Sequence, residues 1–160
     1  MKAGSATVSI TPMVREDLDG VLSIEKASYS VPWTRSMFEV EIKGNPFSVL
    51  LVSRDGEGGP LTGYVCYWVV FDELHIMNLS VRPEYRRRGI GQALAAEAIS
   101  DAWGKGVRLG TLEVRASNDA ARGLYEKMGF KVEAVRKGYY REPREDALIM
   151  NLKTPREHLV

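Results

Sequence analysis

The stretch EYRRRGIGQAL, residues 84–94, places three consecutive arginines directly before two glycines that are separated by one residue. The segment that ends at Arg82 and Pro83 has the pattern of a strand, and a helical pattern begins near Gly89. The first turn of a helix has unpaired backbone amides and a partial positive charge, so it attracts anions. Gly89 and Gly91 have no β carbon, so a phosphate can approach the backbone closely. This stretch therefore predicts a site for a phosphate-bearing ligand.

Two common phosphate-binding motifs do not fit this stretch. The Walker motif requires Gly-Lys followed by Ser or Thr, whereas Gln92 follows Gly91. The dinucleotide-binding motif requires Gly or Ala at the position that Leu94 occupies. From these residues alone, an ordinary helix start with solvated arginines stays an open alternative.

Two further side chains are suited to proton transfer. Glu113 lies in the strand-like segment TLEVRA, where strict alternation puts it on the face opposite Leu112 and Val114. A carboxylate within a central strand is costly unless it has a partner or a task, and an ion pair with Arg115 or with a neighbouring strand is the structural alternative. Tyr125 lies on an otherwise apolar helix face, so core packing is the alternative for its ring.

Composition limits the kind of protein. A chain of 160 residues predicts a single domain, residues 1–160. Lysine and arginine number 22 against 21 acidic residues, so the overall charge does not favour nucleic acid. Cys66 is the single cysteine and lies in an apolar run, which excludes a disulfide framework and favours a core position. With only His75 and His158 as histidines, we expect no metal site.

The sequence has no segment that is typical of secretion or of the membrane. The N-terminus lacks a charged region followed by a long apolar stretch, and no segment approaches the ~20 apolar residues of a membrane helix. Interleaved aromatic and basic motifs for RNA are also lacking. We therefore expect a cytoplasmic protein that makes no direct contact with a membrane or with nucleic acid.

Hydrophobic periodicity predicts the order β, α, α, β, β, β, α, β, α, β, β. A run of meandering strands followed by two strand–helix crossovers indicates an α/β fold with a mixed sheet flanked by helices. We expect helices over residues 17–28, 34–43, 89–104 and 118–128, and strands over residues 8–14, 47–55, 61–72, 73–82, 108–116, 131–140 and 146–152.

A strand, then Arg-Arg-Arg-Gly-Ile-Gly, then a helix resembles the pyrophosphate loop of the GNAT superfamily of N-acetyltransferases. The family pattern Gln/Arg-x-x-Gly-x-Gly/Ala is filled here by Arg86, Gly89 and Gly91. The stretches NLSVRPEYRRRGIG and LEVRASNDAARGLYEKMGF are similar to the RimI-like branch, the protein N-terminal acetyltransferases. The segments at 32–38 and 138–150 fit the same branch, so the resemblance covers about residues 8–152.

The resemblance implies the GNAT fold: a single, mostly antiparallel, twisted sheet of about seven strands with a splayed central strand pair, flanked by about four helices. It implies acetyl-CoA as co-substrate and no metal. Asn118 is expected to face the coenzyme and also to cap a helix. The residues that the resemblance places at the coenzyme are Leu79, Ser80, Val81, Arg86, Arg87, Arg88, Gly89, Ile90, Gly91, Gln92, Asn118 and Tyr125.

The resemblance also implies direct attack of an amine on the thioester in a ternary complex, with Glu113 as proton acceptor and Tyr125 at the coenzyme sulfur. An α-amine with a pKa near ~8 is deprotonated at pH 7 for about 1–1.5 kcal/mol, whereas a lysine near ~10.4 costs roughly 4.6 kcal/mol. One ordinary glutamate therefore suits an N-terminal amine better. A phenol is a weaker acid than a thiol, so a hydrogen bond to the thiolate describes the role of Tyr125 better than full proton donation.

The substrate implied by the resemblance is a protein N-terminus, such as that of an alanine-initiated ribosomal protein. Tyr139 and Tyr140 are expected in the loop before the last strand, on one side of the acceptor. Glu25, Tyr29 and Trp33 are expected on the opposite side, near the loop between the first two helices, and packing roles stay open for all five. Two alternatives remain: acetylation of a small-molecule amine, and a non-catalytic CoA-binding module.

Overall fold

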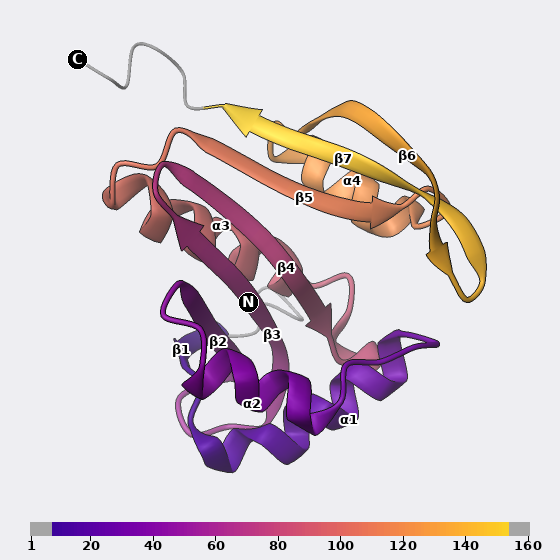
Figure 1. The fold of residues 1–160 in the computed structure, drawn as a ribbon. Helices are drawn as coiled ribbons and strands as arrows, with labels where there is room; N and C mark the ends of the chain where they lie inside the picture. The colour runs from indigo at the N-terminus through magenta and orange to yellow at the C-terminus, as the bar shows by residue number, and fades with distance from the viewer. Residues whose placement is uncertain (1–7, 154–160) are drawn as a thin grey trace.

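The computed structural model describes residues 8–153 (Figure 1). The order of its elements is the predicted one, and residues 1–7, 154–160 and with them His158 lie outside the described part. The strands are β1 (Val8–Pro12), β2 (Ser48–Asp55), β3 (Leu61–Val70), β4 (Glu73–Val81), β5 (Leu109–Arg115), β6 (Lys131–Arg141) and β7 (Arg144–Lys153). The helices are α1 (Leu18–Ser28), α2 (Arg35–Lys43), α3 (Ile90–Gly104) and α4 (Asp119–Lys127), with short 3-10 turns at Arg15–Asp17 and Pro83–Tyr85.

The seven strands form one sheet in the order β1-β2-β3-β4-β5-β7-β6. Every neighbouring pair is antiparallel except β4 and β5, which are joined through α3 and run parallel. The last strand, β7, lies between β5 and β6, so the crossover through α4 skips one position in the sheet. The predicted α/β fold with a mostly antiparallel sheet is thus confirmed.

Helices cover both faces of the sheet (Figure 1). On one face α3 and α4 pack on the central strands, and α3 presents alanines every three to four residues, which lets the helix lie close to the sheet. On the other face α1 and α2 enclose a smaller cluster around Phe38 and Tyr64. The buried α3 residues are Ile90, Leu94, Ala95, Ala98 and Ala102.

The parallel pair β4–β5 opens part of the way along its length. Pairing runs from Glu73 opposite Leu109 to Ile76 opposite Leu112 and then stops. At the same point the β3–β4 register skips Met77, which forms a bulge in β4. Beyond the bulge β4 and β5 diverge, as Figure 1 shows, so the predicted splayed central pair is confirmed.

The bulge also changes which side chains face which helices. Before it, Ile76 belongs to the core under α3. After it, Leu79 packs toward α3, whereas Asn78 bonds to groups of the α1 face. A continuous strand would have kept Ile76 and Asn78 on the same face, because side chains alternate with a period of two. The extra residue therefore sends Asn78 to the α1 side.

Cys66 is a core residue, as predicted. Its thiol is fully buried, and burial raises its pKa to about 12. Within residues 8–153, no group of three histidine, cysteine or acidic side chains is arranged to hold a metal ion. Across the same residues, no helix is both long and apolar enough to cross a membrane.

Candidate active site

The predicted anion-binding turn lies at the start of α3. Gly89 precedes the helix with a φ of +81°, a conformation that favours glycine, and its carbonyl oxygen accepts a hydrogen bond from the amide of Ala93 at 3.0 Å. The first turn consists of Ile90, Gly91 and Gln92 and contains no acidic side chain. Its amides therefore offer the positive helix end that a pyrophosphate requires.

Gly91 marks the place where α3, α4 and β4 meet. A β carbon on Gly91 would lie 3.5 Å from the side chain of Leu124, 3.6 Å from Leu79 and 3.7 Å from Val81. A larger side chain at this position would fill the space between the helix start and the open part of β4. The close approach thus places the anion-binding turn directly beside the splay.

The three arginines have different surroundings. The Arg86 guanidinium donates to the carbonyl oxygen of Val81 at 3.0 Å and to the Ser28 hydroxyl at 3.1 Å, which ties the turn to β4 and α1. Arg88 lies over the ring of Tyr85, 5.0 Å from its centre. Arg87 is exposed with a φ of +64°. The three adjacent positions therefore do not direct their side chains to one point.

The open stretch of β4 contains the expected coenzyme residues Leu79, Ser80 and Val81. One of its backbone carbonyls already has a hydrogen-bond donor, because the Tyr29 hydroxyl donates to the carbonyl oxygen of Leu79 at 2.9 Å. The Ser80 side chain is buried and hydrogen-bonds to Tyr29. Tyr29, which was expected on the acceptor side, therefore lies in direct contact with the strand expected to bind the coenzyme.

Glu113 is the first residue of β5 beyond the last position that pairs with β4, and it remains paired with Ile149 of β7. Its neighbours Leu112 and Val114 are buried under α3 and α4, so Glu113 faces the opposite side, as alternation predicted. Its side chain is 35% exposed, and the Arg136 guanidinium lies 3.9 Å from its carboxylate. Hydrogen bonding to Glu113 raises the pKa of the Tyr139 hydroxyl.

Among residues 8–153, Glu113 has one cation nearby, Arg136, and forms no ion pair with Arg115. Arg115 does not pair with Glu113, because its guanidinium lies 3.4 Å from Glu145 on β7. The cation near Glu113 comes instead from Arg136 on β6, two strands away in the sheet. At 3.9 Å, with Arg136 59% exposed, that contact is a weak ion pair. The carboxylate thus remains accessible on the α1 face.

Tyr125 lies on the other face of the sheet, in the core under α4. Its ring meets Phe130 edge-on with 5.5 Å between the ring centres, and burial raises the pKa of its phenol above the ordinary value. The phenol therefore stays protonated and can donate a hydrogen bond. Asn118 caps α4 as predicted, because its side-chain oxygen accepts the amide of Ala121 at 3.1 Å.

Glu25 lies within α1 and its carboxylate is enclosed. It is 1% exposed and accepts hydrogen bonds from the Trp33 amide at 2.8 Å, the Asn78 amide at 3.0 Å and the Tyr64 hydroxyl. This position agrees with the helix expected over residues 17–28, close to the segment between the first two helices. Glu25 fixes the segment after α1 against β3 and β4, and its carboxylate is shielded from solvent.

The remaining acceptor-side residues are aromatic. Trp33 is half-buried and packs on Phe38 with 5.2 Å between ring centres. Tyr139 and Tyr140 lie inside β6, not in a loop, although the β6–β7 register is irregular between Arg136 and Tyr140. The strand expected over residues 131–140 already contained both, and only the expectation that they lie in the loop before the last strand is corrected.

A solvent-open cleft of about 420 Å³ lies between the segment after α1 and the β6–β7 turn. Ser30 and Val31 line it from the segment after α1, and Arg141, Glu142 and Pro143 line it from the end of β6 and the β6–β7 turn. Sequence reasoning missed this lining. It also missed Asn78, whose signal was the single side-chain amide of its strand, and Arg115, whose signal was a second charge on the face of Glu113.

Known proteins resemble this chain in sequence and in architecture. Residues 18–130 match the acetyltransferase (GNAT) family. A Bacillus subtilis protein, provisionally named as a ribosomal protein bS18 alanine N-acetyltransferase, is 40% identical over 143 residues, which cover 89% of this chain and 93% of the relative. The crystal structure of the ribosomal-protein-S18-alanine N-acetyltransferase from Escherichia coli has a TM-score of 0.82 at 33% identity and matches 92% of this chain and 94% of that one. Arabidopsis thaliana NAA60, solved with acetyl-CoA, shares the fold with a TM-score of 0.81 at 22% identity over 92% of this chain and 100% of its own.

Proposed function

Because the chain belongs to the acetyltransferase (GNAT) family, we propose that it transfers acetyl groups from acetyl-CoA to the N-terminal α-amine of a protein. The relatives' names make the alanine N-terminus of ribosomal protein bS18 the first acceptor to test, which implies action in the cytoplasm. The observation that best supports the proposal is the splay: β4 and β5 separate after Ile76 and Leu112, Glu113 follows directly on the α1 face, and Tyr125 lies in the core on the opposite face.

The coenzyme fits the α3 side of this gap. The amides of the first turn of α3 would hold the pyrophosphate, with Arg87 and Arg88 close by in the chain. Gly91 leaves room beside Leu79 and Val81, so the pantetheine arm would lie along the open stretch of β4. When bound, acetyl-CoA supplies an acetyl group already activated as a thioester.

Glu113 would serve as proton acceptor on the α1 face. The α-amine attacks the thioester carbon, a C–N bond forms, the C–S bond breaks, and the proton leaves the nitrogen for the carboxylate, directly or through water. An α-amine with a pKa near ~8 costs only about 1–1.5 kcal/mol to deprotonate at pH 7, so an accessible carboxylate is sufficient.

Tyr125 would stabilise the departing thiolate. Its raised pKa makes it a poorer acid than free tyrosine, so full transfer of the phenolic proton to sulfur is unfavourable. The same raised pKa keeps the hydroxyl protonated as a hydrogen-bond donor. A donor held in a buried position strengthens its interaction with charge that develops during the reaction.

The acceptor side favours a peptide over a small amine. A small cationic substrate needs an enclosed pocket with a free counter-charge. The carboxylate of Glu25 is instead buried and already accepts three hydrogen bonds. The wide cleft between the α1–α2 segment and the β6–β7 turn leaves space for an extended chain.

The test is an acceptor panel with purified protein and acetyl-CoA. It includes peptides that begin with alanine, serine, methionine or glycine, the same peptides with a blocked N-terminus and an internal lysine, and small amines. We expect CoA release with the alanine-initiated peptide, and mass spectrometry should place the acetyl group on the α-amine. Turnover of small amines alone would contradict a protein substrate, and CoA binding without turnover would indicate a non-catalytic module.

A further inference from the structure

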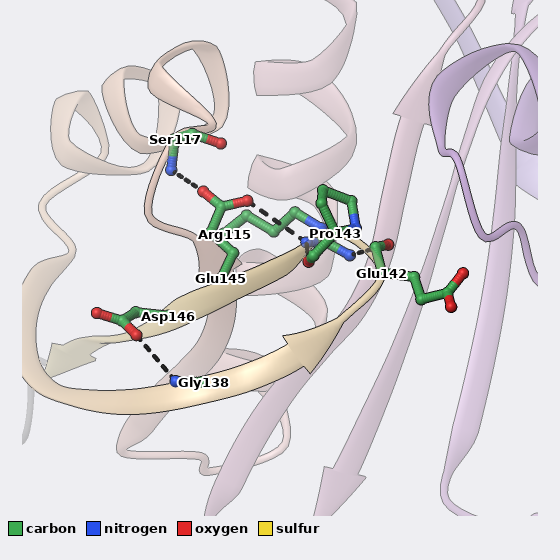
Figure 2. A network of polar contacts seen from close by, with 7 residues as sticks. All are labelled: Arg115, Ser117, Gly138, Glu142, Pro143, Glu145 and Asp146. Atoms are coloured by element: carbon green, nitrogen blue, oxygen red, sulfur yellow. Dashed lines mark hydrogen bonds and ion pairs between the residues drawn. The ribbon is translucent and has the colours of Figure 1, made fainter.

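Arg115 makes an unusual number of contacts for a residue so close to the proposed base. It lies two positions after Glu113 on the same face of β5. Its guanidinium donates to the carbonyl oxygen of Pro143 at 2.9 Å and to that of Glu142 at 3.0 Å, as Figure 2 shows. Both carbonyls belong to the turn between β6 and β7. A side chain of β5 thus binds the turn between β6 and β7, although β7 lies between β5 and β6 in the sheet.

Glu145 fixes the arginine in this position. One carboxylate oxygen lies 3.4 Å from the Arg115 guanidinium, and the other accepts the amide of Ser117 at 2.6 Å (Figure 2). The two side chains are 24% and 18% exposed, so solvent weakens this pair less than it weakens a surface ion pair. Glu145 therefore joins β7 to the chain after β5 and orients the guanidinium toward the turn.

A second acidic residue shapes the opposite strand of the hairpin. The Asp146 carboxylate accepts the amide of Gly138 at 2.8 Å, and Gly138 has a φ of +64° (Figure 2). The contact lies in the irregular stretch of β6, just before Tyr139 and Tyr140. The Tyr140 ring lies under Arg115, 4.2 Å from the guanidinium carbon to the ring centre, and Tyr139 hydrogen-bonds to Glu113.

The turn held by Arg115 is also one wall of the cleft. Glu142 and Pro143, whose carbonyls it binds, line the cleft opposite Ser30 and Val31. The distance between these two walls decides what can enter. A displaced turn would change the cleft and the position of the Tyr140 ring, while the start of α3, on the other face, would keep its geometry.

We propose that Arg115 is a positioning residue for the acceptor: held by Glu145, it fixes the β6–β7 turn and the Tyr140 ring beside Glu113 and so sets the acceptor cleft. This role rests on the proposed acetyl transfer to a peptide. The planar guanidinium reaches two carbonyls, a carboxylate and an aromatic face at once, which an ammonium cannot reproduce. Acceptor binding should therefore depend on Arg115, and coenzyme binding should not.

The experiment compares Arg115→Ala and Arg115→Lys with the wild-type chain, using the alanine-initiated peptide. We expect the KM for the peptide to rise roughly ten- to hundredfold in Arg115→Ala, the scale of lost hydrogen bonds to a charged group. The lysine variant should recover only a small part of this loss. The KM for acetyl-CoA should stay within about twofold, and kcat at saturating peptide should be largely kept.

Lys131→Ala is the matched control, because it removes an exposed cation from the start of β6, at the other end of the same hairpin, and leaves the Arg115 contacts intact. Its kinetic constants should equal those of the wild type. A merely structural role for Arg115 would reduce the active fraction, so kcat would fall and neither KM would change. That pattern, or an equal rise in both KM values, would overturn the proposal.

Amide hydrogen exchange provides a readout that does not depend on turnover. In Arg115→Ala, exchange should accelerate at 138–146 and stay unchanged in α3. If that variant does not fold, Glu145→Gln weakens the same clamp, that is, the contacts by which Arg115 and Glu145 hold the β6–β7 turn. It should accelerate exchange at 138–146 by a smaller factor. Unchanged exchange at 138–146 in a folded variant would refute the clamp. If the wild-type protein binds CoA but acetylates no peptide, the proposed function fails and, with it, the acceptor role; the exchange result would then report on the clamp alone.

Discussion

The Tyr29 hydroxyl donates a hydrogen bond to the carbonyl oxygen of Leu79, 50 positions later in the chain, at 2.9 Å. Burial, together with the nearby charge of Glu25, raises the pKa of Tyr29 to about 12, so the hydroxyl is protonated throughout the physiological range. The contact joins the end of α1 to the open stretch of β4. One hydrogen bond thus links the segment proposed to face the acceptor with the strand proposed to bind the coenzyme.

Removing the Tyr29 hydroxyl should weaken the connection between α1 and β4 without disturbing the core. In Tyr29→Phe the Leu79 carbonyl loses its donor, and we expect unfolding to become easier by about 1 kcal/mol and kcat/KM to fall roughly fivefold. Urea unfolding and steady-state kinetics measure the two effects. A kcat/KM equal to that of the wild type would show that the coenzyme or water replaces the hydroxyl without cost.

Glu113→Gln should remove the proton acceptor and leave the side-chain shape. We expect kcat at pH 7 to fall by roughly 10²–10⁴, the usual contribution of a general base. The deficit should shrink about tenfold between pH 7 and pH 9, because an α-amine with a pKa near ~8 then loses its proton unaided. The check is a pH series of kcat with the alanine-initiated peptide. A deficit that stays constant across that range would argue against Glu113 as the base.

Tyr125→Phe should act on the departing thiolate alone. The ring keeps its contact with Phe130, so stability should change little, whereas kcat should fall roughly ten- to hundredfold through loss of a preorganised donor. Because the pKa of this phenol is raised, the wild-type rate should show no alkaline loss from its ionisation up to pH ~10. Single-turnover acetylation would isolate the step. An unchanged single-turnover rate would exclude a role at the sulfur.

Gln92→Glu adds a negative charge to the first turn of α3 with almost no change of shape. The charge suits the helix dipole and should leave stability equal or higher by about 0.3–1 kcal/mol. It should repel the pyrophosphate, so the Kd for CoA should rise several-fold at low salt and less at high salt. Calorimetric titration measures this. Ala96→Glu, an exposed α3 position about one turn further on, is the control and should bind CoA nearly normally.

Alkaline pH should destabilise the fold through its buried tyrosines. Burial raises the pKa of Tyr29 and Tyr140 to about 12, and it also raises the pKa of Tyr64. An unfolded chain releases these protons near pH ~10, where the folded chain still holds them, so the free energy of unfolding falls as pH rises above that value. Urea unfolding at a series of pH values should give steady stability from pH 7 to 9 and a decline beyond pH 10. Constant stability up to pH 11 would contradict the buried, protonated state of these phenols.

Local sequence determined the elements and their order. The Thr34 and Asn118 caps, the glycines that end the helices and the change of period after Phe47 each act over a few residues, so they can be read from the chain. The resemblance around Arg86, Gly89 and Gly91 gave the family, which the match over residues 18–130 confirms. The catalytic roles of Glu113 and Tyr125 stay proposals that their positions beside the splay support.

Tertiary structure alone decided how these elements meet. The insertion of β7 between β5 and β6 depends on strand pairing over long separations, which periodicity does not encode. The bulge at Met77 reverses the alternation of β4 and sends Asn78 toward Glu25, although no local signal marks an extra residue. Arg115 reaches the β6–β7 turn only because that insertion brings Glu145 beside it. The sequence determines which side chain stands at each position. The partner of that side chain depends on which distant strand the fold places next to it.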